Sequence, residues 1–123
     1  MKKQILQESK NMLEELVSWR HCLHQIPELG LRLPDTTAFV REKLTEMNIP
    51  FTEYEECSCI TAILGKGGKC FLLRSDMDGL PMHEESGEPF ASENGCMHSC
   101  GHDLHTTILL GAAKILKKHE NEL

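Results

Sequence analysis

The most restrictive feature of this sequence is a ten-residue stretch of metal-binding side chains that runs directly into an apolar segment. Residues 96–105 hold two cysteines, three histidines and an aspartate, namely Cys96, Cys100, His98, His102, His105 and Asp103. The apolar residues of the following segment recur at helical spacing and predict a helix over residues 102–118. The apolar face of this predicted helix is expected to consist of Leu104, Ile108, Leu109, Ala112, Ile115 and Leu116. Metal ligands placed just before such a helix would be held rigidly, because the helix itself is fixed by its packing.

Composition narrows the class of protein. The chain has 123 residues, of which 40% are hydrophobic and 26% charged, and this suits one globular domain. A formal net charge of -6 argues against nucleic acid or an anionic membrane surface as a partner. The sequence has no run of about 18 apolar residues, which a membrane-spanning helix would need. Neither a membrane nor a nucleic-acid function is therefore expected.

Six cysteines in a chain of this size could indicate a disulfide scaffold, but their spacing is irregular and no secretory signal precedes them. We therefore expect reduced thiols and a cytoplasmic location. Four of the cysteines are expected to be buried or half-buried: Cys22, Cys57, Cys59 and Cys70.

The rest of the pattern predicts an α/β fold. Residues 3–24 and 36–47 show helical periodicity, and Asp35 is a candidate N-cap of the second helix. Strands are predicted at 51–54, 59–65 and 69–76, and the last two would be joined by the glycine-rich turn "GKGGK". The third strand, which contains "CFLLR", is apolar on both faces, as expected inside a sheet. No internal domain boundary is predicted.

Two clusters of polar residues are candidates for chemistry. Asp76 ends the third predicted strand and Asp78 lies just beyond it, where α/β proteins bind ligands, although aspartates are also common in solvated turns. His98, Cys100 and His102 lie two residues apart, so an extended segment could direct all three to one point. Thiolate and imidazole are good zinc ligands, and imidazole also serves manganese, cobalt and nickel. Residue types and spacing thus predict a metal site that is short of ligands.

Several of these residues have a second interpretation. Cys96 is expected to be a loop residue, and His105 is equally compatible with a ligand or a substrate contact. His21 and His24, three apart on a helix, favour a surface or packing role over a metal pair. A closed structural zinc site of Cys96, His98, Cys100 and His102 has suitable ligand types, but its spacing is tighter than that of the usual paired arrangement.

Taken together, three segments carry a family resemblance: "RHCLHQIPELG", "SDMDGLP" and "MHSCGHDLH". With the order of the elements between them, they resemble the metal-dependent amidohydrolases of the aminoacylase, hippurate hydrolase and indole-acetyl-amino-acid hydrolase group, within the zinc-exopeptidase superfamily. The resemblance covers residues 19–116. It implies a three-layer fold with a sheet between helices, a two-metal site, and hydrolysis of the amide bond of N-acyl amino acids.

The resemblance also implies roles for individual residues. Cys100 and His102 would bind a divalent metal, and Asp78 would be the carboxylate that supports catalysis. Four further residues of the motifs would support the site or contact substrate: Asp76, His98, Asp103 and His105. Family members are much longer, and their glutamate base, later histidine ligands and dimer-forming lid domain have no counterpart here. Residues 1–123 are therefore expected to be the N-terminal part of a catalytic domain, inactive alone and prone to self-association. The alternative is a non-catalytic metal-binding or interaction module derived from that family.

Overall fold

The computed structural model describes residues 2–123. Four α-helices, a two-stranded sheet and a short 3-10 helix follow one another along the chain. Their bounds are α1 Lys2–Asn11, α2 Leu13–His24, α3 Pro34–Glu46, β1 Phe51–Tyr54, β2 Cys59–Ala62, α4 His102–Lys118 and η1 Glu120–Glu122. Within this range no helix combines the length and the apolarity that crossing a membrane requires.

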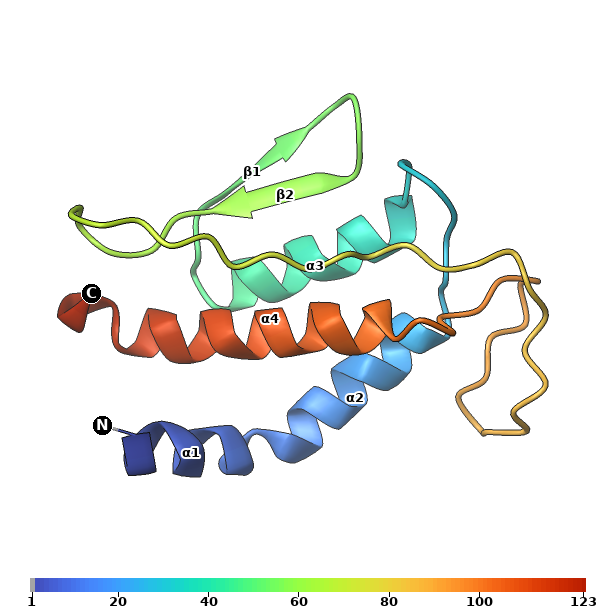
Figure 1. Cartoon of the computed structure of the whole chain (residues 1–123), viewed down its shortest axis with the longest axis horizontal. Coiled ribbons are helices and arrows are strands. Elements are labelled where there is room, and N and C mark those ends of the chain that lie inside the picture. Colours follow the sequence, from blue (N-terminus) through green and yellow to red (C-terminus); the bar gives the residue numbers. More distant parts are fainter. Residues whose placement is uncertain (1) are drawn as a thin grey trace.

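Helix α4 is the central element (Figure 1). Helices α1 and α2 lie along one side of it, and α3 with the β1–β2 hairpin lies along the other. The buried core sits between these helices and consists of Trp19, Val40, Leu44, Ile49 and Leu110. The C-terminal end of α2 and the N-terminal end of α4 meet at the same end of the molecule.

The three predicted helices correspond to four α-helices, because the first prediction is split in two and the second begins two residues early. The predicted helix 3–24 is broken at Met12, which separates α1 from α2. The helix predicted from Thr36 begins at Pro34, because proline suits the first helical position. Asp35 is therefore inside the first turn and is not the cap; instead the Glu28 carboxylate accepts the backbone N–H groups of Asp35 and Thr36, at 3.1 and 2.8 Å. The helix predicted at 102–118 is confirmed.

Two of the three predicted strands form, although the second ends at Ala62 rather than at residue 65. β1 and β2 pair antiparallel, with Phe51 opposite Ala62 and Tyr54 opposite Cys59. The predicted third strand is wrong for this structure: residues 69–76 form no strand, and the side chains of Phe71 and Leu72 are 84% and 87% exposed. The end of the segment contacts α4, where Thr106 Oγ1 donates to the Asp76 backbone oxygen, but no other strand of the described chain pairs with it. The glycine-rich turn therefore joins no hairpin.

The predicted apolar face of α4 is also partly wrong. Leu104 and Ile108 are 47% and 63% exposed. The buried side of the helix instead carries Asp103, Thr106, Thr107, Leu110 and Gly111. Small residues are needed there because α2 crosses closely: a Cβ at Gly111 would lie 3.0 Å from Leu16 Cδ2. Three of the four cysteines expected to be buried are exposed as well, namely Cys22, Cys59 and Cys70.

Candidate metal site

His102, the first residue of α4, is held by Asp78. Its Nδ1 lies 2.9 Å from the backbone oxygen of Asp78 and 3.0 Å from the Oδ1 of the same residue. Both partners are acceptors, so Nδ1 carries the hydrogen and Nε2 remains available as a ligand. A second bond joins the same two segments, because Thr106 Oγ1 donates to the Asp76 backbone oxygen at 3.0 Å. A carboxylate that orients a histidine in this way is typical of metal sites.

Cys100 lies two residues before His102 and its side chain is exposed. Gly101 separates the two and adopts a left-handed conformation, with φ of 79°. A residue with a side chain is strained in this conformation. Gly101 therefore provides the sharp change of direction between the loop that carries Cys100 and the helix that begins with His102.

The other residues of the two motifs make different contacts. The carboxylate of Asp76 pairs with Arg74, so it does not join Asp78 at His102. His105 is exposed, and its ring centroid lies 5.7 Å from that of His102. Neither residue is shown to be a ligand by this arrangement.

The fit to a metal ion is partial. Cys100 and His102 supply a thiol and an oriented imidazole, which are ligand types that zinc accepts. However, no three His, Cys, Asp or Glu side chains within residues 2–123 are grouped so that they could hold one ion. These residues thus offer part of a coordination shell.

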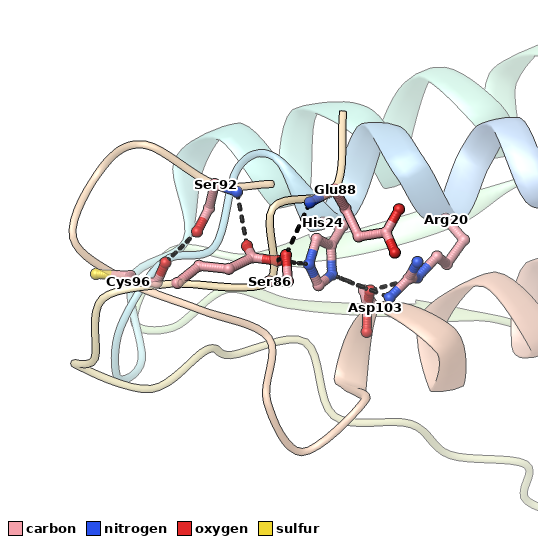
Figure 2. A network of polar contacts seen from close by, with 8 residues as sticks. Arg20, His24, Ser86, Glu88, Ser92, Cys96 and Asp103 are labelled. Carbon is pink, nitrogen blue, oxygen red and sulfur yellow. Dashed lines mark hydrogen bonds and ion pairs between the residues drawn. The ribbon is translucent and has the colours of Figure 1, made fainter. Parts of the chain in front are cut away.

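A buried ionic network lies next to this site (Figure 2). The His24 ring, at the end of α2, lies between two carboxylates. Its Nδ1 is 2.7 Å from Asp103 Oδ2, and its Nε2 is 2.9 Å from Glu84 Oε1. Arg20 Nε donates to the same Asp103 oxygen at 2.8 Å. The side chains of Asp103, His24 and Glu84 are at most 4% exposed. His24 therefore has a buried ionic role that the sequence prediction missed.

Glu84 links this network to the loop before α4. Burial by itself would raise the pKa of Glu84, but hydrogen bonds from Ser86 Oγ, the Ser92 backbone N–H and His24 lower it to about 2. The Ser86 and Ser92 bonds measure 2.6 and 2.7 Å. Ser92 Oγ in turn donates to the backbone oxygen of Cys96.

His98 is buried beside the network, with its ring centroid 6.4 Å from that of His24. Neither ring nitrogen has a hydrogen-bond partner among the described residues. Burial lowers the pKa of His98; the negative charge of Asp103 opposes this shift, and the positive charge of His24 adds to it. His98 therefore does not share a hydrogen-bonded site with Cys100 and His102.

Comparison with known proteins agrees with the motifs that carry this geometry. Residues 72–123 match the model of Peptidase family M20/M25/M40. The chain resembles an M20 peptidase. It is 42% identical over 113 residues to the N-acetyl-L-cysteine deacetylase of Bacillus subtilis (strain 168), a match that covers 89% of this chain and 27% of the relative. It is 36% identical over 124 residues to the N-acyl-L-amino acid amidohydrolase of Geobacillus stearothermophilus, covering 95% and 34%.

A solved structure extends the M20 likeness to the fold. The Bacillus subtilis YXEP protein, described as a dinuclear metal-binding peptidase of the M20 family, superposes with a TM-score of 0.85 at 36% identity. The match covers 93% of this chain and 33% of that one. The resemblance and the α/β fold class predicted from the sequence are thus confirmed. The chain spans about a third or less of the length of these M20 relatives.

Proposed function

We propose that residues 1–123 form the N-terminal part of the catalytic domain of a metal-dependent amidohydrolase that cleaves N-acyl amino acids. The observation that carries this proposal is the orientation of His102 by Asp78, two residues after the exposed thiol of Cys100. The names of the similar proteins support the substrate class, since N-acetyl-L-cysteine is itself an N-acyl amino acid.

In this proposal Cys100 and His102 Nε2 bind a divalent metal, and the rest of the protein completes a two-metal site. Zinc suits both ligands, whereas manganese, cobalt and nickel are candidates because of the imidazole. A metal bound there would polarise the scissile carbonyl and activate a water. Asp78 keeps Nε2 of His102 directed to the metal, and its negative charge increases the basicity of the ring.

The described residues offer no good candidate for the general base. Glu84 is an acidic residue of the loop before α4, but both of its oxygens accept hydrogen bonds and its side chain is buried. A base must reach the attacking water at hydrogen-bond distance. We therefore propose that the base comes from the part of the protein that the longer relatives have in addition, and that the 123-residue chain alone has no amidohydrolase activity.

A chimera tests this function. Residues 1–123 would replace the matching segment of the Bacillus subtilis deacetylase, and hydrolysis of N-acetyl-L-cysteine and other N-acyl amino acids would be measured with added zinc, manganese, cobalt or nickel. We expect activity that is lost in Cys100→Ala and retained in Cys96→Ala, which serves as the matched control.

Three results would count against the proposal. A chimera whose activity survives Cys100→Ala would remove Cys100 from the metal site. A folded chimera that binds metal without turnover would favour a non-catalytic metal-binding module. Turnover by the 123-residue chain alone, if abolished by Cys100→Ala, would show that a base is present within it.

A further inference from the structure

We propose that Arg20, His24 and Glu84 are positioning residues: they hold Asp103 and the loop before α4, and thereby fix the orientation of His102 and Cys100. The inference rests on the proposed metal-binding role of Cys100 and His102. It concerns residues that contact neither of these two side chains.

The first step is the anchoring of Asp103. This residue directly follows His102, and its side chain is fully buried against α2. Its Oδ2 accepts hydrogen bonds from Arg20 Nε at 2.8 Å and from His24 Nδ1 at 2.7 Å. Both donors come from the last turns of α2. The network thus joins the end of α2 to the first turn of α4.

The second step is the arrangement of charges. Asp103 and Glu84 each place a carboxylate oxygen against one ring nitrogen of His24, at 2.7 and 2.9 Å, and Arg20 Nη2 lies 3.3 Å from the same Nδ1 that faces Asp103. The cationic Arg20 thus contacts both the buried carboxylate of Asp103 and the His24 ring that joins Asp103 to Glu84. A buried network of this kind is specific for one geometry, because removing any member leaves an unpaired charge that is costly to bury.

The third step is the loop between Leu80 and Met97. Backbone bonds of 2.9 and 3.0 Å between these two residues close its base. Inside the loop, Glu84 accepts the Ser92 N–H. Ser92 Oγ donates to the Cys96 backbone oxygen, as Figure 2 shows. Glu84 therefore connects His24 to the loop segment that runs through Cys96 to Cys100.

The consequence for the candidate ligands follows from helix geometry. Consecutive residues of a helix are about 100° apart, so one turn places Asp103 against α2 while His102 meets Asp78. If the Asp103 anchor loosens, the first turn can rotate and His102 loses its fixed bond to Asp78. Residues that orient a metal ligand typically change metal affinity by about 10–100-fold when replaced.

The test uses the 123-residue chain and two measurements. The first is cobalt(II) titration, followed by the thiolate-to-cobalt charge-transfer band. The second needs no metal: ¹⁵N NMR of the histidine rings reports whether His102 keeps a single tautomer with hydrogen on Nδ1. The main variant is Glu84→Gln. Its matched control is Glu28→Gln, because Glu28 is also a carboxylate that accepts backbone N–H groups, but it lies outside the network.

A second pair of variants covers the case in which Glu84→Gln fails to fold. Arg20 is partly exposed, so its replacement is milder. Arg20→Gln removes the charge, and Arg20→Lys restores it. We expect Glu84→Gln and Arg20→Gln to weaken cobalt binding about tenfold and to mix the His102 tautomers. Glu28→Gln and Arg20→Lys should keep cobalt affinity within about threefold of the wild type, by the same scale, and should preserve the tautomer.

The inference is overturned if folded Glu84→Gln or Arg20→Gln keeps both the wild-type affinity and a single His102 tautomer. It is equally overturned if the wild-type chain shows mixed tautomers. If the wild type gives no charge-transfer band, the metal site proposed for Cys100 fails in this chain. The NMR comparison then still decides the positioning role.

Discussion

Cys100 and Cys96 flank His98 in the sequence but differ in their surroundings. Cys100 has an exposed thiol beside the start of α4. Cys96 belongs to the loop, where its backbone N–H bonds to Asn94 Oδ1 at 3.0 Å and its backbone oxygen accepts from Ser92. Only backbone groups of Cys96 make these bonds, so loss of its thiol should leave the loop in place.

We therefore predict that Cys100→Ala weakens binding of zinc or cobalt to the 123-residue chain by about tenfold or more, because one of two candidate ligands is lost. Cys96→Ala should have little effect. Metal titration of both variants checks this, and equal losses in the two variants would contradict the assignment of Cys100.

The sequence identifies some residues of the candidate site and misses others. Cys100, His102 and Asp78 were found as candidates because short spacing and a family resemblance mark them. Arg20 and Glu84 were not found, since the contacts of the ionic network join residues 60 to 83 positions apart. The one local sign was that Arg20 and His24 lie four residues apart on one helix, where side chains are neighbours.

At the scale of elements, α1 is the helix held most weakly, because none of its residues is buried. Its Glu8 pairs with Lys118 at 2.7 Å and with His119 at 2.9 Å, at the far end of α4. Hydrogen bonds from Lys118 and then His119 lower the pKa of Glu8 to about 2. Hydrogen bonds to Glu122 and then Glu8 raise the pKa of His119.

These shifts predict a pH window for the docking of α1. The Glu8 contribution is present above the ordinary pKa of 4.5 and is lost as the pH falls toward about 2. Glu122, which lies outside α1, is the larger cause of the raised His119 pKa, and only the Glu8 part concerns docking; that part is present at pH values below 6.5 and is lost as the pH rises through the raised value. Docking should thus be strongest between pH 4.5 and 6.5.

Hydrogen exchange of α1 amides, corrected for intrinsic rates, measures this docking. Protection should be greatest inside the window and fall on both sides, while Glu8→Gln should flatten the profile without changing that of α2. Because these groups lie near the surface, the effect is expected to be small and to weaken with added salt. An α1 profile that Glu8→Gln leaves unchanged would contradict this account.

A helix or strand is predicted correctly where the signal for it lies within the segment itself. The apolar spacing and the following lysines mark α4 from His102 to Lys118. Prediction failed at residues 69–76, because a strand needs a neighbouring strand, and "CFLLR" has none among the described residues. The apolar face of α4 was misjudged for a similar reason: Leu104 and Ile108 suit burial, but which side is covered depends on where α2 packs.

At the scale of the whole molecule, an apolar segment remains uncovered. Four of its side chains are between 57% and 87% exposed, namely Ile63, Phe71, Leu72 and Leu73. Unpaired backbone next to exposed apolar side chains favours pairing with another chain. We predict that the 123-residue chain self-associates as its concentration rises, which light scattering or sedimentation measures.

Leu72→Lys should reduce this association, because a charge on an unpaired edge opposes strand pairing. Leu31→Lys is the matched control, since Leu31 is also exposed, at 76%, but lies elsewhere in the chain. A wild-type chain that stays monomeric over a wide concentration range would contradict the prediction, and so would equal effects of the two lysines.

The central claim is that Cys100 and His102 bind a catalytic metal, and anomalous X-ray diffraction from zinc-loaded crystals of the chimera tests it most directly. The account predicts zinc at about 2.3 Å from Cys100 Sγ and about 2.0–2.1 Å from His102 Nε2, with His102 Nδ1 still bonded to Asp78. Zinc bound at other residues, with the Cys100 thiol free, would contradict it.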